Sequence, residues 1–203
     1  MEKNNFLLIV PFILIISIGL IMISSSSIYI AQNLTGNPFY FSSKQFLFFS
    51  IGLMSMIIFL KIPSDFLFKT DWLFLLISII LLITLLIPGL GAEVNGSIRW
   101  IDIGPFNIQP SEICKFSLIL YISGYCVRRL SDINKLRSFL KPLLLLSAIS
   151  LLILSQPDLG STAIICALVV GILFFAGISF SQFLMLIILL IFLGYAAITS
   201  SPM

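Results

Sequence analysis

Residues 72–87 read WLFLLISIILLITLLI, a run without a charged side chain that is typical of a helix crossing a lipid bilayer. The rest of the 203-residue chain has the same character, since 60% of its residues are hydrophobic and only 9% are charged. In a soluble domain, by contrast, about a quarter of the residues are charged. The sequence therefore predicts an all-α polytopic membrane protein.

Six further apolar segments accompany this run, and we expect each of the seven to form a transmembrane helix. Several are shorter than the ~20 residues that span a typical bilayer, so that flanking turns contribute or the local bilayer is thinner. The first segment lacks a small-residue cleavage site and is expected to remain as a span. The expected spans are residues 6–23, 46–60, 72–87, 110–127, 142–155, 163–178 and 183–198.

Lysine and arginine predict the orientation, because cytoplasmic loops of membrane proteins carry an excess of these residues. With a cytoplasmic amino terminus, eight of the eleven basic residues fall inside the cell. Lys44 and Arg99 fall outside, and Lys115 lies near a membrane edge. The basic run at residues 128–141 is interpreted as an inner-side anchor, with an anionic lipid or a cytoplasmic partner as the alternative.

The composition excludes several classes of site. The chain contains no histidine, which rules out a Ser-His-Asp triad, a histidine-ligated zinc site and an HExxH protease within it. Cys114, Cys126 and Cys166 lie in apolar stretches without metal-ligand spacing and are interpreted as small hydrophobic residues. The net charge of +3 is spread between apolar segments, so that nucleic-acid binding is not expected.

The longest connection, residues 88–111, joins the third and fourth spans on the outside of a single transmembrane domain over residues 1–203. Long loops in compact proteins are usually functional or disordered, and the mixture of aromatic and charged residues predicts an ordered loop on the membrane surface. Arg99 suits bidentate contact with a phosphate, and Trp100 offers a flat face to a lipid chain or a sugar ring. The alternative is an interfacial belt in which Arg99 pairs with Asp102.

Residues 109–115, QPSEICK, mark the start of the fourth span. Pro110 suits the first turn of a helix and Ser111 can cap it. Glu112 and Lys115 lie one turn apart on one face and are expected to form an ion pair. Since an intramembrane lysine needs a cavity or a partner, the pair is a candidate functional site. The alternative is that Lys115 extends to the interface and Glu112 only compensates the helix dipole.

Residues 156–162, QPDLGST, interrupt the apolar stretch between the fifth and sixth spans. The sequence Pro-Asp-Leu-Gly at 157–160 is typical of a turn, and either Asp158 or Ser161 is expected to cap the following helix. The alternative is functional, because irregular backbone and a carboxylate at membrane depth are tolerated where they line a cavity or are buried in protein.

Taken in order, these motifs resemble the SEDS family (shape, elongation, division and sporulation) over essentially the whole chain. Residues 37–41 and 139–142 resemble the cell-division branch of that family more than the elongation branch. The motifs are VNGSIRWI at 94–101, IQPSE at 108–112 followed by Lys115, QPDLGS at 156–161 and FFAG at 174–177.

The resemblance implies a glycosyltransferase of about ten transmembrane helices that polymerises lipid II into glycan strands at the division septum of the bacterial inner membrane. It also implies a divalent cation and a class B penicillin-binding transpeptidase as partner, beside membrane lipids. The family places its catalytic Asp in an external loop, which we expect beyond Met203. This chain is therefore expected to be the amino-terminal part of the fold and to lack catalysis alone.

Matching positions imply two sets of residues. The residues expected to support substrate binding are Arg99, Trp100, Glu112, Lys115 and Asp158. The structural motif positions are Gly96, Gln109, Pro110, Ser111, Gln156, Pro157 and Gly160. Two other functions fit the same architecture, namely a flippase for a lipid-linked precursor and a scaffold that docks the transpeptidase without catalysis.

Overall fold

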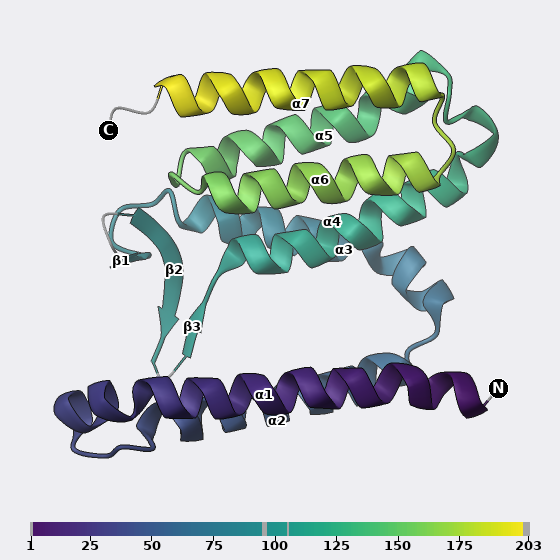
Figure 1. The fold of residues 1–203 in the computed structure, drawn as a ribbon. Helices are drawn as coiled ribbons and strands as arrows, with labels where there is room; N and C mark the ends of the chain where they lie inside the picture. The colour runs from purple at the N-terminus through teal and green to yellow at the C-terminus, as the bar shows by residue number, and fades with distance from the viewer. Residues whose placement is uncertain (1, 95–96, 105, 201–203) are drawn as a thin grey trace. The chain divides into compact units, whose positions relative to one another are not determined.

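The computed structural model describes residues 2–94, 97–104 and 106–200, and the chain is mainly helical over them (Figure 1). Seven α-helices are described, and each overlaps one of the seven predicted spans, which confirms the all-α polytopic fold. The elements are α1 Glu2–Thr35, α2 Tyr40–Lys61, α3 Ser64–Thr84, β1 Ala92–Val94, β2 Ser97–Ile103, β3 Phe106–Ile108, α4 Pro110–Arg128, the 3-10 helix η1 Leu130–Asp132, α5 Leu136–Leu154, α6 Leu159–Phe175 and α7 Phe180–Ser200.

Helix length and hydropathy support a membrane location. The stretches Val10–Thr35, Tyr40–Lys61, Ser64–Thr84 and Leu136–Leu154 are long and apolar enough to cross a bilayer. The stretches Leu159–Phe175 and Phe180–Ile191 are apolar but shorter. Helix α4 is less apolar than the others because it carries Glu112, Lys115 and Arg128.

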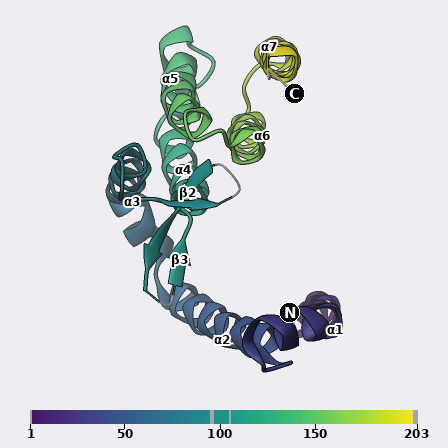
Figure 2. The same cartoon turned by 90° about the vertical axis from the view of Figure 1, so that its left-hand side faces the viewer.

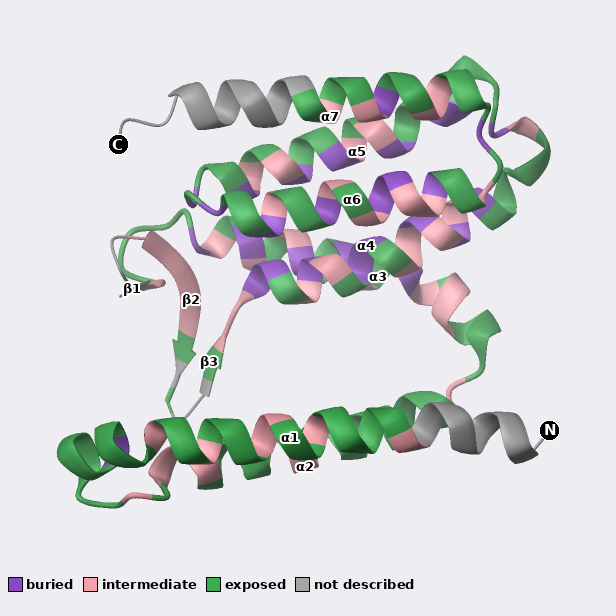
Figure 3. Cartoon of the chain, in the orientation of Figure 1, coloured by how far each residue is buried: buried purple, intermediate pink, exposed green. Residues whose placement is uncertain are grey.

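The chain divides into two compact units, Met1–Pro63 and Ser64–Met203. Unit 1 is the hairpin of α1 and α2, which pack on each other. The described side chains of this hairpin are mostly exposed, and α2 has no buried residue (Figure 3). Since these side chains are largely apolar, lipid tails are their natural surroundings.

Helix α1 continues well beyond the predicted span at 6–23. The predicted span ended at residue 23, directly before the serines at 24–27. In the structure Ser24 Oγ donates to the Leu20 carbonyl at 2.7 Å, and Ser26 Oγ donates to the Ile23 carbonyl at 3.3 Å. The hydroxyls of Ser24 and Ser26 are thus satisfied within their own helix, and the helix runs on to Thr35.

Unit 2 is a bundle of α3 to α7 with the strands at one end (Figure 1). Helix α4 contacts both α3 and α6, while α6 also contacts α5 and α7. Figure 2 views these helices nearly end-on and shows α4 between α3 and α6. Helices α4 and α6 therefore form the centre of the bundle, and their first turns lie where the predicted site residues are.

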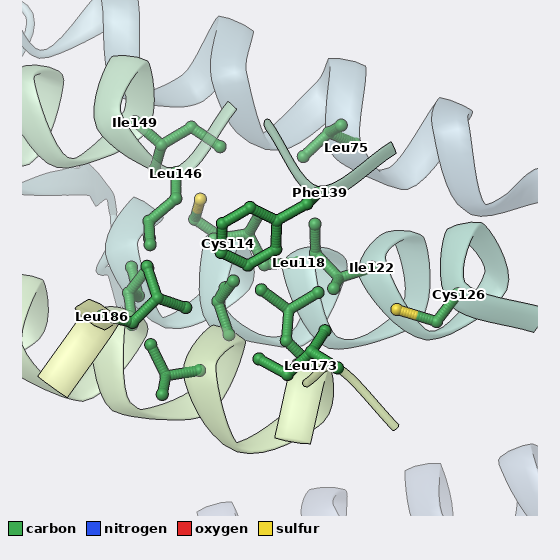
Figure 4. Close-up of a cluster of buried hydrophobic side chains, with 14 of the residues drawn as sticks. Leu75, Cys114, Leu118, Ile122, Cys126, Phe139, Leu146, Ile149, Leu173 and Leu186 are labelled. Atoms are coloured by element: carbon green, nitrogen blue, oxygen red, sulfur yellow. The ribbon is translucent and has the colours of Figure 1, made fainter. Parts of the chain in front are cut away.

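The core of unit 2 is formed by apolar side chains from every one of its helices. Leu118 of α4, Phe139 of α5 and Leu173 of α6 are almost completely buried at its centre (Figure 4). Cys114 and Cys126 are buried and unpaired, and Cys166 is partly buried and unpaired. This confirms the interpretation of the cysteines as small hydrophobic residues.

Over its described residues, the connection between α3 and α4 contains a sheet that was not predicted from the sequence. Strands β1, β2 and β3 pair antiparallel in that order. Trp100 lies opposite Ala92 in the first pair, and Ile101 lies opposite Ile108 in the second. Gly104 adopts a φ of +64° at the turn between β2 and β3, a conformation that favours glycine.

Candidate functional site

Three segments that are far apart in the sequence meet at one end of unit 2. They are residues 97–101 of β2, residues 109–115 at the start of α4, and residues 155–162, which form the turn after α5 and the first turn of α6. We call this region the outer end, since the predicted orientation places it outside the cell. All five residues predicted to support substrate binding lie in it.

Glu112 and Lys115 form the ion pair that their spacing predicts. Lys115 Nζ donates a hydrogen bond to Glu112 Oε1 across 2.6 Å. The Lys115 side chain is only 16% exposed, whereas that of Glu112 is 59% exposed, so the cation is the more deeply placed partner. A lysine in an apolar helix is stable when an anionic partner or a cavity accommodates its charge, and Glu112 is that partner.

Helix α4 begins at Pro110, as predicted, where the missing N–H of proline costs no hydrogen bond. The prediction that Ser111 caps the helix is wrong, because the cap position is Gln109, which makes no side-chain capping hydrogen bond. Ser111 is buried in the first turn, and its Oγ lies 3.4 Å from Ser161 Oγ. This hydroxyl pair joins the first turns of α4 and α6.

Asp158 is the N-cap of α6, which confirms one of the two predicted caps. Its Oδ1 accepts a hydrogen bond from the Ser161 amide at 3.1 Å. Its carbonyl accepts one from Thr162 Oγ1 at 2.9 Å. The residue is 6% exposed, so its carboxylate is held inside the protein at the beginning of a helix, where the dipole favours negative charge.

Gln156 and Arg99 join the turn before α6 to two other elements. Gln156 is buried, and its Nε2 donates to the Leu82 carbonyl of α3 at 3.1 Å. Arg99 Nε donates to the Gln156 carbonyl at 3.4 Å, and Arg99 Nη2 donates to the Pro157 carbonyl. Arg99 therefore contacts this turn, while Asp102 is exposed. The expected alternative pairing of Arg99 with Asp102 is absent from the described ion pairs.

The remaining predicted positions differ in how far they are exposed. Trp100 is partly buried on β2, Pro157 is exposed in the turn before α6, and Gly160 is exposed in the first turn of α6. Gly96 lies outside the described residues. Across the described ranges, no three Asp, Glu or Cys side chains are grouped as metal ligands.

An ion pair that was not predicted from the sequence lies at the opposite end of unit 2. Asp71 of α3 is 3% exposed in its side chain, and its Oδ2 accepts a hydrogen bond from Arg128 Nη1 of α4 at 2.8 Å. Arg128 Nη1 also donates to the Phe68 carbonyl at 3.1 Å. The expected span began at residue 72, directly after Asp71. The sequence feature that could have predicted this pair is the carboxylate of Asp71 beside an apolar run, because a carboxylate is unusual in membrane helices.

Gly124 provides the space for this ion pair. A methyl group added at its Cα would lie 3.0 Å from Arg128 Nη1 and in direct overlap with Asp71 Oδ2. The glycine is itself buried in α4. The close approach of α3 and α4 at this point therefore depends on the absence of a side chain at residue 124.

Comparison with known proteins gives consistent matches. The sequence model for FtsW, RodA and SpoVE, described as "Cell cycle protein", matches residues 5–202. A probable peptidoglycan glycosyltransferase FtsW of Allochromatium vinosum is 42% identical over 175 residues, which are 85% of this chain and 44% of that protein. One of Alkalilimnicola ehrlichii is 34% identical over 202 residues, 99% of this chain and 50% of that protein. The chain spans about half the length of these curated relatives.

Solved structures show the same fold. The rod shape determining protein RodA of Thermus thermophilus superposes with a TM-score of 0.67 at 24% identity, covering 86% of this chain and 58% of that one. A structure described as "Structural coordination of polymerization and crosslinking by a peptidoglycan synthase complex" superposes with a TM-score of 0.68 at 24% identity, covering 91% of this chain and 55% of that one.

Proposed function

The chain belongs to the FtsW/RodA/SpoVE family of cell cycle proteins, and from this premise we propose that it acts in the polymerisation of lipid II into glycan strands. The reaction is a glycosyl transfer in which an acceptor sugar hydroxyl displaces the undecaprenyl pyrophosphate of the donor. The FtsW names of the relatives favour the cell-division branch. The proposed location is the bacterial cytoplasmic membrane at the division septum.

The observation that carries this proposal is the partly buried cation at the outer end. Lys115 is mostly enclosed by protein, and its Nζ forms an ion pair with Glu112 Oε1 at 2.6 Å. A fixed positive charge of this kind stabilises a departing pyrophosphate more strongly than a solvated lysine does, because little water screens it. Glu112 orients Lys115 in this scheme, and Arg99 adds a second positive charge on β2.

The other outer-end residues have supporting roles in the proposal. Trp100 packs on a sugar ring or a lipid chain, and Asp158 fixes the first turn of α6, beside that of α4. A general base is still required to deprotonate the acceptor hydroxyl. We assign that base to no described residue.

The proposed partner is a class B penicillin-binding transpeptidase, which crosslinks the strands that a glycosyltransferase makes. The description of one solved neighbour, which speaks of polymerisation and crosslinking in one synthase complex, supports this choice. The proposed substrate is lipid II, since the curated relatives are named as probable peptidoglycan glycosyltransferases.

A chimera tests the proposal. The 202 residues of this chain that match the Alkalilimnicola relative replace the matched segment of that protein, and the purified chimera is given lipid II together with the relative's transpeptidase. We expect glycan polymer, and we expect Lys115→Met to lower its rate at least about tenfold, since removing one charge-stabilising group typically costs that much or more. The matched control is Lys44→Met, which removes a lysine that is also predicted to lie outside.

Two outcomes contradict the proposal. One is polymerisation at the unsubstituted rate by a folded Lys115→Met chimera. The other is transport of lipid II across a vesicle membrane by a chimera that makes no polymer, a result that assigns the chain to precursor flipping instead.

A further inference from the structure

A basic pocket lies at the end of unit 2 opposite the outer end. Its volume is about 500 Å³, and it is formed where the end of α4 meets the start of α5. The predicted orientation places it on the cytoplasmic side. The lining residues are Tyr125, Arg129, Lys135, Leu136, Arg137, Ser138 and Lys141.

The charge of this basic pocket is strongly positive. Four of its lining residues are cationic, and one of them, Lys135, pairs with the carboxylate of Asp132 across 2.8 Å. The hydrogen bond and positive charge of Lys135 lower the pKa of Asp132, so that this carboxylate stays ionised and compensates one cation. Arg129, Arg137 and Lys141 form none of the ion pairs found among the described residues.

The walls of the pocket are fixed by contacts between α4 and α5. Tyr125 Oη donates to the Ser138 carbonyl at 2.9 Å. Ser138 is 9% exposed, and the next residue, Phe139, is buried in the core of unit 2. The first-turn amides of a helix have no intrahelical acceptor and carry partial positive charge, so the start of α5 adds to the attraction for an anion.

An apolar stripe on α5 leads away from the pocket. Leu136 lies in the pocket lining and is 68% exposed, and Leu140 and Leu144 follow at four-residue spacing with exposures of 42% and 67%. Residues at this spacing share one face of a helix. A ligand with its phosphate in the pocket would therefore find a continuous apolar surface for acyl chains beside it.

We propose that this basic pocket binds the phosphate of an anionic phospholipid from the cytoplasmic leaflet, with the acyl chains along Leu136, Leu140 and Leu144. Basic pockets between transmembrane helices on the cytoplasmic side are suited to such headgroups. A soluble phosphate ion is also negatively charged, but it has no acyl chains to contact the apolar stripe. The proposal is independent of the glycosyltransferase assignment, because no outer-end residue takes part.

The first test uses the unsubstituted chain of residues 1–203, purified in detergent. Phosphatidylglycerol and phosphatidylcholine of identical acyl chains are added at equal concentration, and retained lipid is counted by native mass spectrometry. We expect phosphatidylglycerol to bind at least about fivefold more tightly, since each cation near a membrane surface contributes roughly that factor. Equal retention of the two lipids would overturn the proposal.

The second test removes the two free cations of α5. We expect Arg137→Gln with Lys141→Gln to weaken phosphatidylglycerol binding about tenfold or more, toward the phosphatidylcholine value. The matched control is Lys61→Gln with Lys69→Gln, which removes two lysines predicted to be on the same side but outside the pocket lining. Circular dichroism verifies that both variants fold. Equal losses in the two double variants would assign the effect to general surface charge.

A third measurement separates the two sources of phosphate. Inorganic phosphate at millimolar concentration is expected to leave phosphatidylglycerol bound, because it lacks the acyl chains. Displacement of the lipid by inorganic phosphate at concentrations equal to that of the lipid would show a soluble-phosphate site and contradict the lipid assignment.

Discussion

At the scale of single residues, Gly124 controls how closely α3 and α4 approach. We expect Gly124→Ala to destabilise the protein by about 1 to 3 kcal/mol, the usual cost of overpacking a filled interior. The new methyl group would displace Asp71 Oδ2, and the Asp71 side chain is 3% exposed and has little room to move. Thermal unfolding in detergent measures the change.

The matched control is Gly171→Ala in α6, where an added Cβ meets nothing within 4 Å. We expect this variant to be as stable as the unsubstituted protein or slightly more stable, since alanine favours helices over glycine. Equal stability of the Gly124 and Gly171 variants would show that the ion pair rearranges without cost.

The sequence predicted individual contacts only where both partners lie close together in the chain. The Glu112–Lys115 pair and the Asp158 cap each join residues three apart, and helix geometry fixes such neighbours. Asp71 and Arg128 lie 57 residues apart, as do Arg99 and Gln156. These pairs depend on how helices pack, which a single sequence does not specify.

At the scale of elements, the Asp158 cap determines the start of α6. We expect Asp158→Ala to cost about 0.5 to 2 kcal/mol, because the Ser161 amide loses its acceptor. We expect Asp158→Asn to keep the stability of the unsubstituted protein, because asparagine caps helices as well as aspartate does. Chemical unfolding of both variants in detergent measures the difference.

The same two variants separate capping from a role of the charge. In the chimera we expect Asp158→Asn to retain glycan synthesis, because the cap needs an oxygen acceptor rather than a full charge. Loss of synthesis with unchanged stability would instead assign the carboxylate a direct part in the reaction. Asp102→Asn, at an exposed carboxylate of β2, is the control for a general effect of charge.

Helices were predictable from the sequence and strands were not. The apolar runs that mark the helices extend well over ten residues, so composition alone identifies them. The helix ends in the structure differ from the predicted span ends at two kinds of position. One is where polar residues fit within a helix, as at Ser24 of α1, and the other is where a proline lies in an early turn, as at Pro142 of α5. Strands β1 and β3 are three residues long, too short for an alternating pattern to stand out.

At the scale of the whole molecule, the core of unit 2 contains no residue of unit 1 among its described members. We therefore expect a fragment of residues 64–203 to unfold cooperatively in detergent, with a midpoint within a few degrees of that of the whole chain. A fragment that starts at residue 88 is the control, because it loses Leu75 and Leu82 of α3 from the core. Similar midpoints for the two fragments would show that α3 contributes little to unit 2.

The ion pair between Asp71 and Arg128 also bears on how the protein enters the membrane during synthesis. Asp71 lies seven residues into α3, about 10 Å along the helix axis. An unpaired aspartate at the centre of a lone helix costs about 2.5 to 3.5 kcal/mol on insertion, and less toward its end. Arg128, at the far end of α4, is synthesised 57 residues later. We therefore expect α3 to stay beside the translocon until α4 has emerged, so that the two helices pass into lipid as a neutral pair.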